Sequence, residues 1–283
     1  MKRSNLKVYD SIIYSQDISI VNINPNSLYF AFGIEDSKTS NRFIDETIYY
    51  PKILFFEREK VNGEFQIINR LELEYEPCRG ESFGENYKHL ISETDFNNSY
   101  CLKDFNLTLV GGYKYDNFSY LRIRIYACKN STENNNHCKP QEVIDKYIKG
   151  TYFSLITKDI GLNPSNISYP VVYTLQNIYT TIDKSMYRDF IIYYGITEVQ
   201  SDMGLFYENI ETQKYLQFRK EVQSFYFRDE SEYYGGKAIC SIDFRLDDLI
   251  YIQKRSYSKM NETFSIIGGY MQLVSTAFTL YLF

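Results

Sequence analysis

The stretch Phe264–Phe283, FSIIGGYMQLVSTAFTLYLF, contains no charged residue and stands at the C-terminal end of the chain. At a rise of about 1.5 Å per residue, a helix of this length is roughly 30 Å long, which matches the hydrocarbon thickness of a bilayer. The sequence therefore predicts a transmembrane helix over residues 264–283, with Gly268 and Gly269 at its start. A buried C-terminal helix or a pair of core strands is the alternative, because Gln272 and the two glycines dilute the apolar character.

The composition of the whole chain favours β-structure. Among its 283 residues are 29 Tyr and 20 Phe, with no Trp. Tyr, Phe and Ile fit a pleated, half-buried surface. The formal net charge is −5 and the sequence contains no basic tract. Phosphate contacts need clustered Lys and Arg, so nucleic acid is excluded as a partner.

One hairpin is visible from local sequence alone. Residues 52–60 and 65–75 are strand patterns on either side of Asn62-Gly63. Asn-Gly between two such runs predicts a tight hairpin, because both residues accept a positive φ. In the second arm Leu71 and Leu73 alternate with glutamates, which predicts a strand with one buried and one wet face.

Further strand patterns recur along the chain, at residues 27–34, 106–115, 118–128, 152–156, 171–175, 189–194, 215–218, 224–228 and 239–246. Pro140 followed by QEVIDKYIKG predicts one short helix that ends at Gly150. Short strands at this spacing predict a mainly β fold: an antiparallel β-sandwich-like ectodomain with one short helix, followed by the C-terminal transmembrane helix.

The predicted elements divide the chain into an N-terminal segment (1–26), a β-rich extracytoplasmic domain (27–251), a juxtamembrane segment (252–263) and the transmembrane helix (264–283). The opening MKRSNLKVYDSII has the basic residues of a signal peptide without an apolar run behind them. Nothing follows the predicted span, so we expect a truncated chain or an incomplete gene model. Lys254, Arg255 and Lys259 precede the span, and the positive-inside rule places such a flank in the cytosol.

The five cysteines give a second indication of the compartment. Cys78 and Cys101 bracket one polar loop, and Cys128 and Cys138 bracket another. Disulfides across these loops predict an oxidising compartment, and each removes chain entropy worth roughly 3 kcal/mol. Free buried thiols are the alternative. Cys240 has no assigned partner.

Glycosylation motifs bear on the same question. The N-x-S/T pattern begins at Asn97, Asn106, Asn117, Asn130 and Asn166, and also at Asn261. In a chain this rich in Asn, Ser and Thr, roughly half of these motifs arise by chance. Their concentration around the cysteines favours an extracytoplasmic domain, and we give this more weight than the basic flank.

Motifs for catalysis and metal binding are absent from the sequence. It has no GxSxG, HExxH, P-loop or dinucleotide fingerprint, and no CxxC pair. Asp247 and Asp248 are adjacent on a strand pattern and point to opposite faces, so a surface turn is favoured over an acid–base pair. His89 and His137 fall in polar loops, where solvated side chains are the default. We therefore expect no enzyme, no cofactor and no metal.

Several separated motifs resemble a known family. The run LYFAFGIEDSKTSNRFID, the segment CKNSTENNNHCKPQEVIDKYIKGTYFSL and the closing KRSYSKMNETFSIIGG are similar to a large family of uncharacterised transmembrane proteins of ciliates. The resemblance implies a β-rich extracytoplasmic region with cysteines, here Cys128 and Cys138, between two membrane helices, the second opening with an Ile-Gly-Gly motif at Gly268 and Gly269. The layout also resembles the vesicle cargo receptors of the early secretory pathway.

Together these features predict a membrane-anchored extracytoplasmic binding protein, receptor-like or cargo-receptor-like. Its partners would be membrane lipid, through the C-terminal helix, and a protein or glycan, through a tyrosine-rich surface. We expect the main domain on the lumenal or extracellular side, in the secretory pathway or at the cell surface. A structural or auxiliary subunit of a membrane complex is the alternative, and a membrane-anchored hydrolase is a further one.

Overall fold

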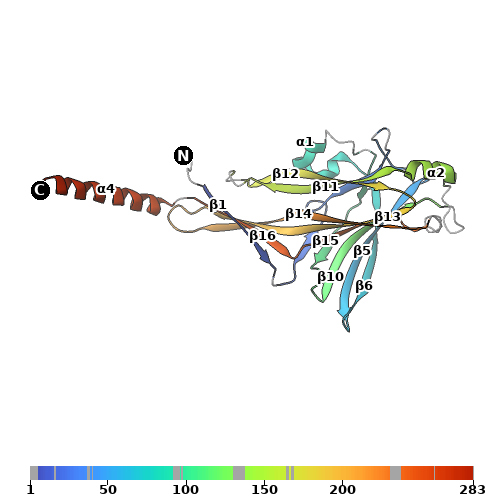
Figure 1. Ribbon diagram of the computed structural model, residues 1–283, viewed down its shortest axis with the longest axis horizontal. Coiled ribbons are helices and arrows are strands. Elements are labelled where there is room, and N and C mark those ends of the chain that lie inside the picture. The colour runs from blue at the N-terminus through green and yellow to red at the C-terminus, as the bar shows by residue number, and fades with distance from the viewer. Residues whose placement is uncertain are drawn as a thin grey trace.

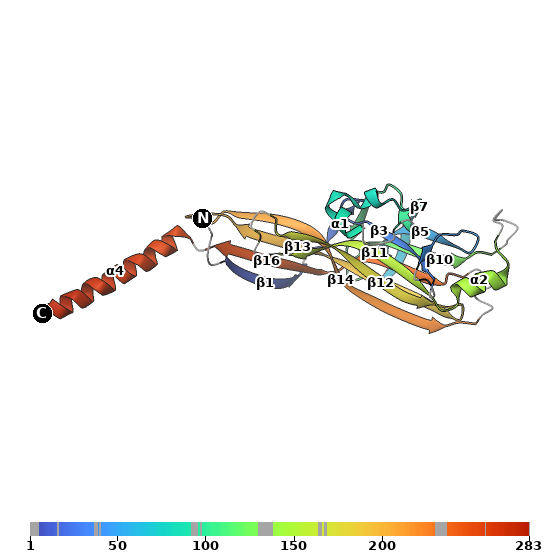
Figure 2. The same ribbon diagram turned by 90° about the horizontal axis from the view of Figure 1, so that it is seen from above.

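The computed structural model describes residues 6–282 apart from 16, 37–38, 40, 92–95, 97, 130–137, 164–165, 167–168, 230–236 and 258. Two β-sheets pack on one another at one end of the molecule (Figure 1). The strands of the larger sheet continue towards the other end, where a long helix projects from them (Figure 2).

The larger sheet contains eight strands in the order β1-β16-β13-β15-β10-β5-β6, with β14 paired to β13. Their bounds are β1 (Leu6–Tyr14), β5 (Tyr49–Val61), β6 (Glu64–Leu73), β10 (Asn117–Ala127), β13 (Met186–Asp202), β14 (Ile210–Phe227), β15 (Cys240–Leu246) and β16 (Leu249–Tyr257). The sheet therefore extends past both ends of the predicted 27–251 body.

The smaller sheet contains six strands in the order β12-β11-β3-β8-β7, with β4 paired to β3. Their bounds are β3 (Phe30–Glu35), β4 (Arg42–Phe43), β7 (Tyr75–Pro77), β8 (Tyr100–Leu102), β11 (Thr151–Leu162) and β12 (Val171–Ile182). A separate pair consists of β2 (Ile20–Ile23) and β9 (Leu107–Val110). Helical elements are η1 (Gly80–Phe83), η2 (Glu85–Tyr87), α1 (Lys88–Ile91), α2 (Gln141–Ile148) and α4 (Met260–Leu282).

Aromatic side chains fill the core between the two sheets. Phe30 of β3 stacks on Phe244 of β15 with ring centroids 4.7 Å apart, and both rings are fully buried. Phe153 of β11 and Tyr194 of β13 join them in the same cluster. The mainly β fold with stacked sheets is therefore confirmed.

The predicted hairpin and the predicted short helix are both present. Asn62 and Gly63 have φ values of 54° and 87° and connect β5 to β6. The helix α2 begins after Pro140, and Gly150 with φ 68° follows its end. Local rules succeed here because each signal lies within a few residues of the turn or cap that it specifies.

Strand directions differ from the antiparallel arrangement that the sequence predicts. β13 pairs in parallel with both β15 and β16, so the larger sheet is mixed. The residues after β14 return to the start of β13, where Cys240 lies opposite Arg188, and then run in the direction of β13. The pattern of buried and exposed residues along a strand does not specify the direction of its neighbour, which explains the error.

Several predicted short strands merge into long ones. β14 is one element of 18 residues that contains the predicted strand 215–218 and all but the last residue of the predicted strand 224–228, and β13 has 17 residues. The two strands form an antiparallel hairpin over their whole length, with a shift in register at Tyr193 and Tyr194. Exposed charged residues interrupt the apolar pattern of β14, so the sequence shows only fragments of it.

The C-terminal stretch is helical as predicted, but its other properties are corrected. α4 begins at Met260, about two turns before Gly268 and Gly269, so these glycines do not mark its start. Among the helices that the structure describes, none is both long enough and apolar enough to cross a membrane. The predicted transmembrane helix is therefore not supported, because polar and small residues such as Gln272 dilute the apolar side chains.

Both predicted disulfides are present. Cys78 is joined to Cys101, and Cys128 to Cys138. The segment between Cys78 and Cys101, predicted to be a polar loop, contains η1, η2 and α1. The two disulfides indicate an oxidising environment.

Candidate functional site

A break between β15 and β16 forms a pocket in the larger sheet. Leu246 ends β15 and Leu249 begins β16, with Asp247 and Asp248 between them. The Asp247 N–H donates to the Tyr194 carbonyl across 2.7 Å, which keeps the break attached to β13. On one side of the break the chain lies against β10, and on the other side against β1.

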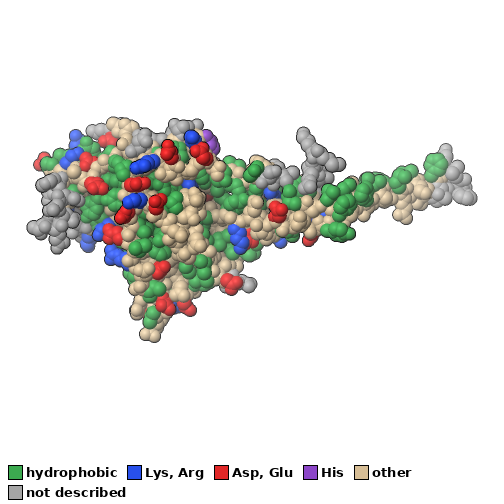
Figure 3. All heavy atoms as spheres, turned by 180° about the vertical axis from the view of Figure 1, so that it is seen from behind, with side chains coloured by type: hydrophobic (Ala, Val, Ile, Leu, Met, Phe, Trp, Pro, Cys, Tyr) green, Lys and Arg blue, Asp and Glu red, His purple; other side chains and the backbone are tan. Residues whose placement is uncertain are grey.

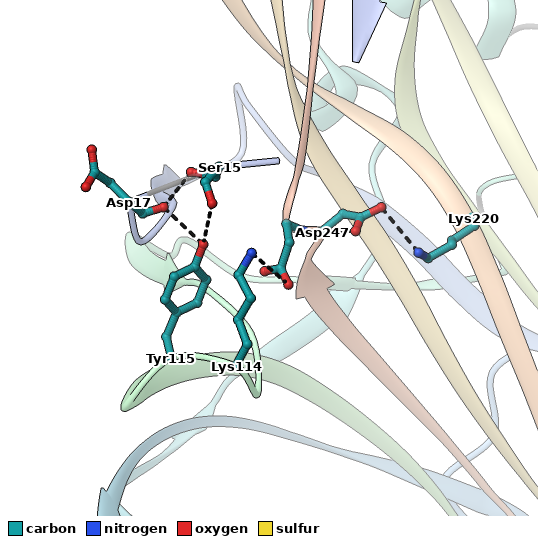
Figure 4. A network of polar contacts seen from close by, with 7 residues as sticks. Ser15, Asp17, Lys114, Tyr115, Lys220 and Asp247 are labelled. Atoms are coloured by element: carbon teal, nitrogen blue, oxygen red, sulfur yellow. Dashed lines mark hydrogen bonds and ion pairs between the residues drawn. The ribbon is translucent and has the colours of Figure 1, made fainter. Parts of the chain in front are cut away.

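We call the resulting cavity the strand-break pocket. Its volume is about 370 Å³, and both carboxylates line it together with Lys114 and Lys220. Lys220 Nζ lies 3.4 Å from Asp247 Oδ2, and Lys114 Nζ lies 3.4 Å from Asp248 Oδ2 (Figure 4). Each carboxylate therefore has its own lysine, and the two do not form a shared acid–base pair.

Aromatic rings accompany the charged groups of the pocket. Lys220 Nζ lies 4.9 Å from the centre of the Tyr193 ring, and the Arg245 guanidinium lies 5.0 Å from that of Tyr113. Both rings line the cavity, and 51% of Tyr113 is exposed. The pocket thus combines positive groups, negative groups and ring faces.

The loop from β9 to β10 holds Lys114 in place. Tyr115 in this loop donates its hydroxyl to the carbonyls of Ser15 (3.2 Å) and Asp17 (3.1 Å), as Figure 4 shows. Gly111 has φ 28°, and a side chain there would meet the Tyr115 ring at 2.8 Å. Glycine is therefore required where the loop turns back towards β1.

Next to the pocket lies a buried charge cluster that joins β10 to β15. Asp243 of β15 is fully buried and accepts from Arg122 Nε (2.5 Å) and Nη2 (2.8 Å) of β10. Arg245 also donates to this carboxylate. Burial raises the pKa of the neighbouring Asp189 on β13, and repulsion from Asp243 adds to the effect. This cluster fixes Arg245 beside the pocket.

α4 presents a second surface of interest. Over residues 264–278, at 100° per residue, the large apolar side chains fall on one half of the helix, while Ser, Thr, Gly and Gln residues fall on the other. All of these apolar residues are exposed, namely Phe264, Ile266, Ile267, Tyr270, Met271, Leu273, Val274 and Phe278. Figure 3 shows hydrophobic side chains along the projecting helix, away from the β-body.

The sequence-predicted site residues lie apart from this pocket. Asn106, Asn117 and Asn166 are exposed, whereas Asn97 and Asn130 lie outside the described residues. Exposure is compatible with glycosylation, which stays a prediction. Cys240 is fully buried and unbonded, and burial raises its pKa, so it is a core residue without thiolate character.

Metal chemistry finds no support in the part of the chain that the structure describes. There, no three His, Cys, Asp or Glu side chains come close enough to hold an ion. His89 is exposed, and His137 lies outside the described residues. Lys114, Lys220 and Tyr193 were not predicted as site residues, because their partners in the pocket are distant along the chain. The only local signal was Gly111-Gly112, which marks the turn of the loop.

A model of one protein family matches most of the chain. It is described as the uncharacterised 80 kDa protein N-terminal domain, and it matches residues 31–247. The chain belongs to this family. The match covers both disulfides and the strand-break pocket apart from Asp248, and it ends before β16 and α4. The similarity to ciliate transmembrane proteins and the Ile-Gly-Gly motif stay predictions.

Other comparisons are distant. No curated protein matches the chain. The crystal structure of Erv41p is similar with 11% sequence identity and a TM-score of 0.28, over 87% of this chain and 99% of that one. The cryo-EM structure of a proton-activated chloride channel has 9% identity and a TM-score of 0.28, over 98% of this chain and 84% of that one. Both TM-scores are too low for any conclusion about fold or function.

Proposed function

We propose that this chain is a membrane-associated binding protein whose β-rich body lies on the lumenal or extracellular side. The proposal rests on the exposed apolar half of α4. Its apolar half is exposed along the helix, and the helix projects from the end of the larger sheet (Figure 2). A helix of this kind is stabilised by burying its apolar face in the interface of a lipid membrane.

The side of the membrane follows from the cysteines. Two disulfides close loops of the body, and such bonds persist in secreted and lumenal proteins rather than in the cytosol. The exposed asparagines of three glycosylation motifs lie on the same body. The protein therefore meets its ligand outside the cytosol.

For the ligand we favour a hydroxyl-rich molecule such as a glycan, bound in the strand-break pocket. A strong anion would meet Asp247 and Asp248, and a strong cation would meet Lys114 and Lys220. Neutral hydroxyls both donate and accept, so they match neighbouring carboxylate and ammonium groups. The Tyr113 and Tyr193 rings offer flat apolar faces to the C–H side of a sugar.

Flotation with neutral phosphatidylcholine vesicles tests the membrane association. We expect the full chain to float with the vesicles and the variant Ile266→Lys/Ile267→Lys to remain below, because two charges would enter the apolar face of α4. The matched control is Ile67→Lys/Ile68→Lys, a pair of equally exposed isoleucines on β6. Equal flotation of both double variants would contradict the proposal.

A glycan array tests the ligand. We expect the full chain to bind a subset of glycans and Lys220→Met to bind about tenfold more weakly, since one charge-assisted hydrogen bond is lost. Lys103→Met, which removes the exposed pair of Lys103 with Glu74, serves as the control. Robust hydrolysis of the arrayed glycans would indicate an enzyme instead. In a separate purification from membranes, stoichiometric co-purification with a multi-span protein would indicate an auxiliary subunit.

A further inference from the structure

The loop from β13 to β14, residues 203–209, carries a second apolar surface. Leu205, Phe206 and Tyr207 are consecutive, and their exposed fractions are 50%, 48% and 85%. Three large exposed hydrophobic residues in a row are costly in water, where no neighbour covers them. Their position at the tip of the longest hairpin places them at one end of the larger sheet (Figure 1).

Polar contacts fix the shape of this loop. Asp202 accepts the N–H groups of Gly204 (3.1 Å) and Asn209 (2.9 Å), and Met203 N–H donates to the Asn209 carbonyl (2.8 Å). The Tyr207 carbonyl approaches Gly204 so closely that a side chain there would overlap it. The tip is therefore a defined structure that presents the three apolar side chains outward.

The same loop is bonded to the first turn of α4. Met260 N–H donates to the Leu205 carbonyl across 3.0 Å. Lys259 Nζ donates to the Tyr207 carbonyl (3.0 Å) and to the Asp202 carboxylate. The side chains of Lys259 and Asp202 are both nearly buried, so their ion pair is shielded from water. It holds the loop against the start of the helix.

From this geometry we infer that loop 203–209 is a second lipid-contacting element, which enters the same membrane surface as α4. The inference rests on the proposed membrane association. It commits to lipid because hydrogen bonds from Met260 and Lys259 join the loop to the start of α4, where the helix projects from the end of the larger sheet (Figures 1 and 2). Phe and Tyr also suit the interfacial region, where one end of a side chain is apolar and the other is wet.

Membrane contact through both α4 and loop 203–209 would restrict the orientation of the body, which contact through α4 alone would not. A helix attached to a body at a single point leaves the body free to tilt. A loop bonded to the root of that helix, and entering the same lipid, sets the direction of the β13–β14 hairpin relative to the membrane. The hairpin spans roughly 50 Å at about 3.3 Å per residue, so it would hold the far end of β14 well away from the lipid.

The absence of Trp from the sequence provides a direct test. Three single-Trp variants of the full chain are compared on phosphatidylcholine vesicles with bromine-labelled acyl chains: Phe206→Trp at the loop, Tyr270→Trp on α4 and Phe227→Trp at the opposite end of β14. We expect quenching and a blue shift at Phe206→Trp and Tyr270→Trp, and neither at Phe227→Trp. Phe227 is the matched control because it is an exposed aromatic of the same hairpin.

The outcomes separate the two proposals. Quenching at Tyr270→Trp without quenching at Phe206→Trp overturns the inference and leaves the membrane association intact. Lack of quenching at both positions overturns both. Quenching at Phe227→Trp as well overturns the inferred orientation and with it the role of the loop.

Vesicle partitioning of serine variants is a second test, which does not depend on whether the tryptophan of Phe206→Trp alters the loop. Leu205→Ser/Phe206→Ser should reduce partitioning onto neutral vesicles roughly tenfold or more, because two apolar side chains no longer leave water. Phe225→Ser/Phe227→Ser removes two exposed aromatics from the far end of β14 and should leave partitioning unchanged. Equal partitioning of the two variants overturns the inference.

Discussion

At the scale of single residues, Lys158 of β11 is the most unusual charged side chain. It is 5% exposed, and its Nζ donates to the Pro25 carbonyl (2.7 Å). The rings of Tyr29, Phe83 and Tyr87 surround this amine, with centres 5.5, 5.9 and 5.2 Å away. Burial lowers the pKa of Lys158 to about 8.

This lowered pKa predicts a pH dependence of stability. Between pH 8 and the ordinary lysine value of 10.5, the unfolded chain binds more protons at Lys158 than the folded chain. The free energy of unfolding therefore rises with pH over that window, and the penalty is fully present below pH 8. Urea unfolding should show this rise in the natural chain and not in Lys158→Met. A parallel pH profile of the two proteins would contradict it.

Gly204 gives a second prediction at this scale. A Cβ at this position would lie 1.7 Å from the Tyr207 carbonyl oxygen, so Gly204→Ala must move the loop. We expect a loss of about 1–3 kcal/mol in the free energy of unfolding. The control is Gly268→Ala in α4, where nothing lies within 4 Å and the helix should gain about 0.5–1 kcal/mol of stability. Chemical denaturation measures both.

At the scale of elements, the disulfides are testable stabilisers. Cys78 and Cys101 are separated by 23 residues, and loop-closure entropy assigns their bond about 3 kcal/mol. Cys78→Ala/Cys101→Ala should lose about this amount of unfolding free energy, measured in denaturant without reductant. In the presence of a reductant, natural chain and variant should converge. If the variant matches the oxidised natural chain, the bond does not stabilise the body.

The elements that were predicted are those whose signals lie in the local sequence. The elements that depend on partners far away along the chain were not predicted. The β5–β6 hairpin follows from Asn62-Gly63, and α2 follows from Pro140 and Gly150, all within the element or next to it. The parallel pairing of β13 was missed because its partners lie at residues 240–257. β1 was missed because none of its residues is buried and because its partner strand β16 lies at residues 249–257.

The same reasoning explains why the strand-break pocket was missed. Asp247-Asp248 forms a partly buried break between two strands instead of the predicted surface turn, and its two carboxylates contact different lysines. Their partners Lys114 and Lys220 come from a loop and from β14, and no spacing along the chain brings them together. A mixed pocket of this kind becomes visible only once the break between β15 and β16 is placed against β13.

At the scale of the whole molecule, the proposed function depends on how the two ends of the protein are arranged. One end is the two-sheet body with both disulfides, and the other is α4 with loop 203–209 at its root (Figure 1). The long β13–β14 hairpin joins them, so under the proposed membrane association a ligand bound to the body would lie at a fixed distance from the lipid. This arrangement suits a receptor-like protein better than a freely diffusing one.

Protease protection of sealed microsomes, followed by non-reducing peptide mapping, tests the central claim most directly. The full chain is expressed in a eukaryotic secretory pathway, and the membrane fraction is treated with protease before and after detergent. We expect the chain in the membrane fraction, with its body protected until detergent is added and with Cys78 joined to Cys101 and Cys128 to Cys138. A chain in the soluble fraction, or a body digested in intact vesicles with free thiols at these four positions, would contradict the account.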